Sequence, residues 1–203
     1  MGNSTNLTDL DTFKEPTSVP DISKIPLAKV EGFIGRVFDF KCLFPSGLGA
    51  DGWIAGSCVR DYLIGSKPPG DVAIFFRSEV EMVIYQINIL KNDFEFKSVK
   101  CKDNVVNIET SIFNNTLKVQ LVKSVFRETP EDVVNKFDYT ISQFLIDENY
   151  LYCGNHSLKD LQDKRLRVHC MTYPISSMRR IIEYVKCGFV ANNPDPTQIL
   201  YLD

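Results

Sequence analysis

Apolar and polar residues follow two different periodicities in the middle of the chain. Residues 72–76 form an almost continuous apolar run, which is typical of a strand covered on both faces. The next stretch has apolar residues at helical spacing after Ser78, a favoured N-cap residue, so a helix is predicted to about residue 92. Three strand-like stretches follow, over residues 94–101, 105–113 and 117–122. The last two are joined by Asn114-Asn115, a suitable hairpin turn.

Similar patterns predict short elements on either side of this block. A strand at residues 52–55 precedes a helix at residues 58–64, and the mixed apolar spacing of residues 25–44 is compatible with a helix. Further helices are predicted at "TPEDVV", "SLKDLQDKRL" and "PISSMRRIIEYVKCGF". The fold class is therefore α+β, with a small mixed β-sheet flanked by helices. The expected divisions are a flexible N-terminal arm (1–24), a core domain (25–150) and a short helical extension with the tail (151–203).

The composition narrows the functional classes. With 44% hydrophobic residues the chain can bury an ordinary core, and a net charge of −3 does not favour general binding to nucleic acid. The six cysteines lie far apart without a CxxC pair, which argues against structural zinc and for reduced thiols. No apolar run approaches the ~18 residues of a membrane span, and no stretch resembles a signal peptide. We therefore expect a soluble, cytoplasmic protein.

Candidate chemistry is concentrated in "GWIAGSCVRDYLIGSKPPGDVAIFF", residues 52–76. A Gly56-Ser57 turn between a strand and a helix offers backbone N–H groups and a hydroxyl to phosphate oxygens. Asp71 begins the next strand, and residue 73 projects to the same side. Carboxylates at both positions would suit the divalent cations of phosphoryl or nucleotidyl transfer, but residue 73 is an alanine.

These residues resemble the head-domain signature of the polymerase-beta-like nucleotidyltransferases, in particular the poly(A) polymerase and CCA-adding branch. That signature reads roughly G-G/S-x-V-R-D-x-L-x-G, a polar turn, then D-x-D. The resemblance continues in "KFDYTISQFLID", "HSLKDLQDKRLRVH" and "MRRIIEYVKCGF", which are similar to three later segments of that branch. The four segments lie in the family's order and cover about residues 53–189. The resemblance implies a nucleotidyltransferase-type sheet followed by a neck-like helical extension.

The resemblance assigns the first segment to the nucleotide. It implies that Gly56 and Ser57 grip the triphosphate of an NTP substrate. Arg60 and Asp61 match the R-D pair of the signature, although Asp61 is equally a candidate helix cap or ion-pair partner.

The metal-binding part of the signature is incomplete. The resemblance implies that Asp71 ligates Mg²⁺ or Mn²⁺, with Ala73 at the position of the second acid. Gln120 stands where many members of the wider superfamily have a third acid, and a neutral amide is a poor cation ligand. Because the rest of the signature persists, we interpret Ala73 as an introduced or late replacement of aspartate in an otherwise competent enzyme. A natural inactive relative is the alternative.

The later segments supply the remaining candidates. Asp138 matches an acid that lies near the nucleotide, while the basic residue before it is replaced by Phe137. Arg179 or Arg180 is expected to reach phosphate or base, because a guanidinium suits phosphate oxygens. The spacing to Gly188 leaves the choice between the two arginines open, and both could also be surface residues of an amphipathic helix.

Three functions are compatible with these residues. The first is a metal-dependent transfer of a nucleoside monophosphate from an NTP to a hydroxyl acceptor, which could be an RNA or tRNA end, a nucleotide or a protein. The chain holds the head and only the start of a neck, which favours a compact transferase over a complete tRNA-maturing enzyme. The second is a catalytically inactive module that binds a nucleotide or a partner. The third is a scaffold with an empty pocket.

Overall fold

The computed structural model describes residues 22–30, 41–65, 71–91, 95–112 and 115–191. Eight strands form one sheet in the order β1-β8-β7-β2-β3-β6-β5-β4, in which only β3 and β6 are parallel neighbours. The strands are β1 (Ile22–Pro26), β2 (Gly52–Ala55), β3 (Asp71–Phe76), β4 (Glu95–Cys101), β5 (Val105–Ile112), β6 (Asn115–Val122), β7 (Phe144–Ile146) and β8 (Tyr150–Gly154). The α-helices are α2 (Ser57–Leu63), α3 (Glu79–Lys91), α4 (Pro130–Val134), α5 (Ser157–Gln162) and α6 (Pro174–Lys186).

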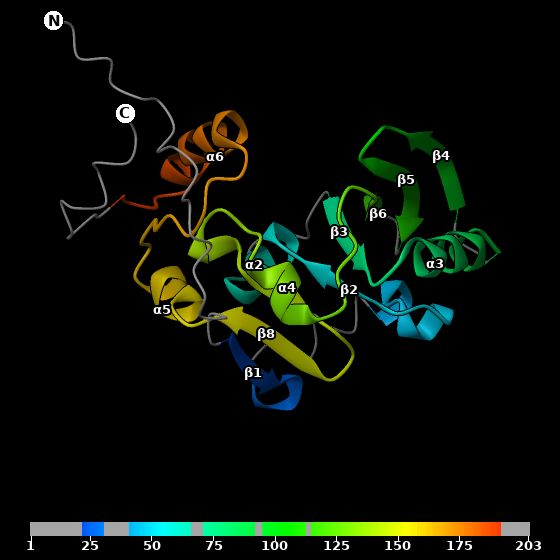
Figure 1. Cartoon of the computed structure of the whole chain (residues 1–203), viewed down its shortest axis with the longest axis horizontal. Coiled ribbons are helices and arrows are strands. Elements are labelled where there is room, and N and C mark those ends of the chain that lie inside the picture. Colours follow the sequence, from blue (N-terminus) through cyan, green and yellow to red (C-terminus); the bar gives the residue numbers. More distant parts are fainter. Residues whose placement is uncertain (1–21, 31–40, 66–70, 92–94, 113–114, 192–203) are drawn as a thin grey trace, which may run out of the picture.

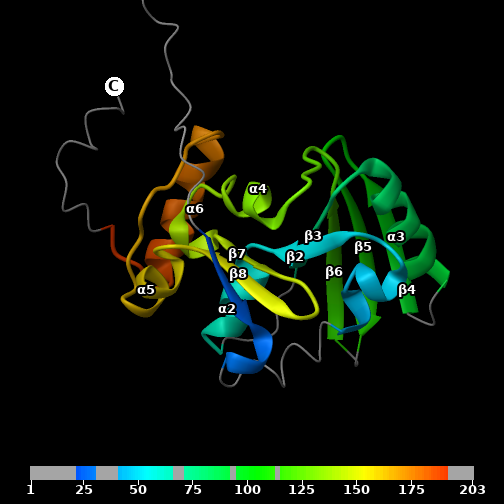
Figure 2. The same ribbon diagram turned by 60° about the horizontal axis from the view of Figure 1, so that its bottom comes forward.

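The helices are distributed unevenly along this sheet. Figures 1 and 2 show α3 beside β4, β5 and β6 at one end of the molecule, and α5 and α6 together at the other end. The main hydrophobic core extends through both ends and includes residues of α2, α3, α6 and most strands. The predicted α+β architecture of a small mixed sheet flanked by helices is confirmed.

β3 has two faces with different surroundings. Three of its side chains are fully buried in the main core: Val72, Ile74 and Phe76. Asp71, Ala73 and Phe75 alternate with them on the opposite face, where Asp71 is exposed and the other two are half-buried. The continuous apolar run predicts a strand covered on both faces, but the second face borders a pocket instead.

Two helix boundaries follow the local signals in the sequence. The Thr129 hydroxyl accepts a hydrogen bond from the Asp132 N–H (3.2 Å), and Pro130 occupies the first position of α4. α6 ends just before Gly188, whose φ of 84° allows the chain to leave the helix. In the described ranges no helix combines the length and the apolar character that crossing a membrane requires.

The structure differs from the expected elements at the β1 end of the sheet. β1 begins at Ile22, inside the range expected to be a flexible arm, and pairs antiparallel with β8. The expected helix over residues 25–44 does not form in the described part, which contains the end of β1 and two short 3-10 turns; residues 31–40 lie outside the described residues. β7 and β8 were not predicted, because runs of three and five residues are too short for periodicity to distinguish.

Candidate functional site

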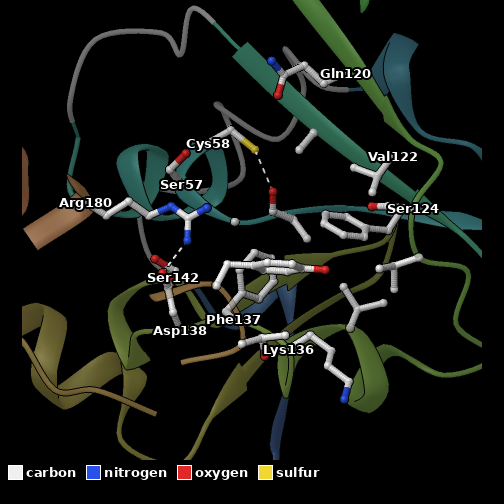
Figure 3. Close-up of a pocket in the computed structure, with 18 of the residues that line it drawn as sticks. Ser57, Cys58, Gln120, Val122, Ser124, Lys136, Phe137, Asp138, Ser142 and Arg180 are labelled. Atoms are coloured by element: carbon white, nitrogen blue, oxygen red, sulfur yellow. Dashed lines mark hydrogen bonds and ion pairs between the residues drawn. The ribbon is translucent and has the colours of Figure 1, made fainter. Parts of the chain in front are cut away.

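A pocket of about 400 Å³ lies between the sheet and the helices that follow it (Figure 3). β3 and β6 form one wall, which we call the sheet wall. The Gly56-Ser57 turn, residues 136–138 and α6 supply the opposite wall, which we call the helix wall. Sequence segments that are more than 120 residues apart therefore meet at one cavity.

The turn at Gly56 is held by backbone geometry. Gly56 has a φ of 89°, and its N–H donates a hydrogen bond to the Phe144 carbonyl (2.8 Å). A Cβ atom at this position would lie 3.3 Å from the Phe137 ring, so both conformation and space favour glycine. The exposed side chain of Ser57 follows at the start of α2 and lines the pocket.

The sheet wall carries a single carboxylate. Asp71, at the start of β3, is half-exposed and lies 3.7 Å from the Lys118 ammonium group on β6. Ala73 pairs in register with Gln120 of β6, so the two positions lie side by side. The Gln120 amide donates a weak hydrogen bond to the Asn107 oxygen (3.4 Å). The two positions where the signature would place further acids are therefore uncharged.

These residues do not fit a two-metal centre. Mg²⁺ and Mn²⁺ require several oxygen ligands, and a pair of ions needs converging negative charge. The part of the chain that the structure describes has no group of three or more acidic, histidine or cysteine side chains that could hold a metal ion. Asp138 also lines the pocket, but it belongs to the helix wall and is paired with Arg180.

The helix wall is built around the ion pair of Asp138 and Arg180. Asp138 is buried, and its carboxylate accepts a hydrogen bond from the Arg180 guanidinium, which remains partly exposed (Figure 3). Arg180 lines the pocket, whereas Arg179 is exposed and is not among the lining residues. The helix is fixed in this rotation from its inner face, where the Tyr139 hydroxyl donates to the Ser177 carbonyl (2.8 Å) and Tyr184 is buried.

A second network supports the segment that carries Asp138. The carboxylate of Asp160 is buried and accepts hydrogen bonds from the Thr140 hydroxyl (2.8 Å) and the Arg167 guanidinium (2.9 Å). Thr140 lies two residues after Asp138, and its N–H donates to the Arg167 carbonyl (3.1 Å). The family-like segment at residues 156–169 thus supports the helix wall without lining the pocket.

Arg60 and Asp61 lie outside the pocket lining. The two side chains form an ion pair (2.7 Å), and the Arg60 guanidinium lies over the Tyr184 ring with 5.0 Å to its centroid. Because Arg60 is a buried residue of α2 and Tyr184 belongs to α6, this contact connects the two helices. In this structure the pair supports the wall rather than facing the cavity.

Part of the remaining lining is aromatic and aliphatic, and sequence reasoning did not identify it. Phe75 and Phe137 meet edge to face with 5.9 Å between ring centroids, beside Val122, Val125 and Val133. In the sequence, Phe137 stands out only as the replacement of a basic residue of the family's segment. Valines are typical of any core, so their pattern carries no signal of a pocket.

Burial affects the ionisation of three groups in or near the pocket. Burial raises the pKa of the Cys58 thiol to about 12, which keeps it protonated although it lines the pocket. Burial, together with the nearby Asp138 carboxylate, raises the pKa of Tyr139 to about 12. Burial lowers the pKa of His169, which favours its neutral form. Cys58 is therefore not a candidate nucleophile, while the Ser57 hydroxyl and the Arg180 guanidinium offer polar groups to the cavity.

Comparison with known proteins supports both the fold and a family. The family model described as Gabija anti-defense 2 family protein matches residues 28–164. A CCA-adding enzyme in complex with ATP is 16% identical with a TM-score of 0.61, over 84% of this chain and 44% of that chain. The Thermotoga maritima CCA-adding enzyme complexed with tRNA is 17% identical with a TM-score of 0.59, over 84% and 43% of the two chains. A tRNA-processing enzyme is 21% identical with a TM-score of 0.52, over 77% and 42%.

These similarities confirm the polymerase-beta-like nucleotidyltransferase fold that the motifs predict. At this level of identity they show the fold alone. The chain spans less than half the length of the solved structures that it matches. No curated protein matches the chain.

Proposed function

The chain belongs to the Gabija anti-defense 2 family, and we propose that it binds a nucleoside triphosphate in the pocket without transferring a nucleotidyl group. The nucleotidyltransferase fold supports a nucleotide as the ligand class. The absence of nucleotidyl transfer is inferred from the small number of acidic residues on the sheet wall. Of its three signature positions only Asp71 is acidic, and Lys118 compensates part of that charge.

The helix wall provides the groups that binding needs. The Arg180 guanidinium has N–H groups beyond the one used by Asp138, and phosphate oxygens accept such groups well. The Ser57 hydroxyl lies on the same cavity and can donate to a second phosphate oxygen. Phe75 and Phe137 offer an apolar surface that suits a nucleobase.

Arg180 and Arg179 form a matched pair for testing this proposal. We expect Arg180→Ala to weaken NTP binding about tenfold to a hundredfold, the worth of a hydrogen bond between charged groups. Arg179→Ala removes the same charge from the same helix outside the pocket and should leave the affinity unchanged. Calorimetric titration with each of the four NTPs measures both. The proposal is wrong if the unmodified chain binds none of them.

Metal removal provides a second test. Because the sheet wall does not fit Mg²⁺ or Mn²⁺, we expect the NTP affinity to change by less than about threefold when EDTA replaces Mg²⁺. A site with metal ions held by the protein would lose binding by far more than that. The same titration, repeated in both buffers, distinguishes these outcomes.

An active, metal-dependent transferase is the second candidate, and the shared face of Asp71 and Ala73 favours it. In that case a single Ala73→Asp change completes the acid pair, and the enzyme would move an NMP to an RNA or tRNA end, a nucleotide or a protein hydroxyl. Labelled NTPs with Mg²⁺ or Mn²⁺ and total cellular RNA and protein would reveal the acceptor. Transfer by the unmodified chain would replace the binding proposal with this one.

The family's description points to a biological setting. We propose that this chain also acts against the Gabija defence, in the cytoplasm where NTPs are available, and that nucleotide binding is part of that action. The chain and its Arg180→Ala and Arg179→Ala variants would be expressed in cells that carry this defence. We expect Arg180→Ala alone to lose the effect. An equal effect of all three chains would separate the anti-defence role from the pocket.

A further inference from the structure

Lys118 of β6 lies beside the acid of the sheet wall. β3 and β6 are parallel neighbours, and their register places Lys118 next to Asp71, and Gln120 next to Ala73. Residues two apart on a strand project to the same face of the sheet, so Lys118 shares a face with Gln120. Gln120 lines the pocket, as do Asp71 and Ala73 (Figure 3). Lys118 therefore lies on the face that borders the cavity, next to a residue of its lining.

We propose that the Lys118 ammonium group binds the phosphate chain of the nucleotide directly. It thereby supplies the positive charge that metal ions supply in a two-metal centre. The Gln120 amide adds a neutral N–H donor on the same wall. This inference rests on the proposed function, because it concerns how the same pocket holds its NTP.

The formal charges of the sheet wall are compatible with an anionic ligand. Asp71 and Lys118 sum to zero, and Ala73 and Gln120 are neutral. Three carboxylates at these signature positions would repel a triphosphate unless cations lay between them. The wall of this chain produces far less repulsion, and it offers an ammonium group in addition.

The ammonium group of Lys118 is accessible and loosely held. It lies 3.7 Å from an Asp71 carboxylate oxygen, which is longer than a hydrogen bond, and 42% of the side chain is exposed. Glu109 lies on the other side, on β5, but its carboxylate accepts a hydrogen bond from the Ser98 hydroxyl of β4 (3.3 Å). An ammonium group has three N–H donors, so Lys118 can stay near Asp71 and still donate to a phosphate oxygen.

The Gly56-Ser57 turn lies across β3 from Lys118. β2 pairs antiparallel with β3, and its last residue, Ala55, is in register with Ala73, so the turn follows near the start of β3. The strand order β2-β3-β6 places Asp71 between the turn and Lys118. β2 and β6 are two strand spacings apart, or about 10 Å. A chain of several phosphates suits this span better than a single phosphate group does.

Calorimetric titration in EDTA tests the role of Lys118, with two ligands: the NTP that the chain binds most tightly, and inorganic tripolyphosphate. We expect Lys118→Met to weaken the binding of both about tenfold, and Lys118→Arg, which keeps the charge, to stay within about threefold. Lys100→Met is the matched control. Lys100 lies on the same face of the sheet but on β4, two strands further from the pocket, so its loss should change either affinity by less than about twofold.

Asp71→Asn tests the sign of the charge that the ligand meets. Without a bound cation this change removes a negative charge near the phosphates, so the NTP affinity should rise, by about threefold. A carboxylate that held a cation would give the opposite result, because its loss would weaken NTP binding in Mg²⁺. A fall in NTP affinity on Asp71→Asn, in either buffer, would contradict direct binding by Lys118.

The same titrations distinguish this inference from the proposed function. If the unmodified chain binds an NTP and Lys118→Met binds it equally well, the role of Lys118 is wrong and the proposed function remains. Equal losses in Lys118→Met and Lys100→Met would also overturn it, because general charge attraction would then explain both. If the unmodified chain binds none of the four NTPs, the proposed function and this inference are both wrong.

Discussion

The two walls of the pocket present different chemistry. The helix wall brings together Ser57, Asp138 and Arg180, and the Asp138 carboxylate of its ion pair is buried while Arg180 stays partly exposed. The sheet wall has Asp71 beside Lys118, and uncharged residues at the two positions that pair in register at its centre. In the proposed function, phosphate recognition depends mainly on the helix wall, whereas metal-dependent catalysis would depend on the sheet wall. The two walls come from separate elements, so a change in one can leave the other intact.

The largest expected effect comes from adding an acid to the sheet wall. Ala73→Asp places a second carboxylate on the same face of β3 as Asp71, which should create affinity for Mg²⁺ or Mn²⁺. If the rest of the site is competent, labelled-nucleotide transfer should rise about 10²-fold to 10³-fold, the usual worth of one electrostatic contributor. Asp71→Asn in the same background is the control and should abolish the gain. Metal binding without any transfer would show that the helix wall no longer positions the triphosphate for reaction.

The next largest effect is expected from removing the Asp160 charge, because its hydrogen bonds support the segment that carries Asp138. Asp160→Asn removes the charge that Arg167 and the Thr140 hydroxyl contact, and the buried amide cannot replace it. We expect the free energy of unfolding to fall by about 2–3 kcal/mol, less than for a fully buried pair because Arg167 is 36% exposed. Urea denaturation measures this. Asp163→Asn, which breaks the exposed pair with Lys159, should cost less than about 0.5 kcal/mol.

A smaller effect is expected at the Gly56-Ser57 turn, which forms part of the helix wall. Gly56→Ala forces an unfavourable conformation and crowds the Phe137 ring, so we expect a loss of about 1–3 kcal/mol in stability together with weaker NTP binding. Gly188→Ala is a useful control, since its φ is also positive but a Cβ there would contact nothing within 4 Å. If both changes affect NTP binding equally, the Gly56 turn does not contact the nucleotide.

The smallest effect concerns thiol reactivity as a function of pH. Burial raises the pKa of Cys58 to about 12 from 9.0, so its contribution to stability is present below pH 9 and is lost as the pH rises towards 12. At pH 8 we expect iodoacetamide to modify the exposed Cys101 and Cys187 but not Cys58, as read by peptide mass mapping. Rapid labelling of Cys58 in the folded chain would mean that the pocket opens further than this structure shows.

Sequence reasoning reached the fold class and the order of most central elements. The helix after Ser78, the capped start of α4 and the strands that became β4 to β6 all follow from local periodicity and capping. The fold family was also correctly predicted from the four motifs. The roles proposed for the site residues remain predictions. The elements that were missed, β1, β7 and β8, are short. β7 and β8 pair with each other locally, but they join the sheet through β2 and β1, which are far away in sequence.

The sequence by itself determined which chemical groups are available: a Gly56-Ser57 turn, one acid at position 71, and alanine at position 73. Only the tertiary structure decided which of two adjacent arginines faces the cavity. Neighbouring residues on a helix point about 100° apart, and the rotation of α6 is set by the burial of Ser177 and Tyr184 on its inner face. Likewise, the pairing of Ala73 with Gln120 depends on the parallel register of β3 and β6, which local sequence does not encode.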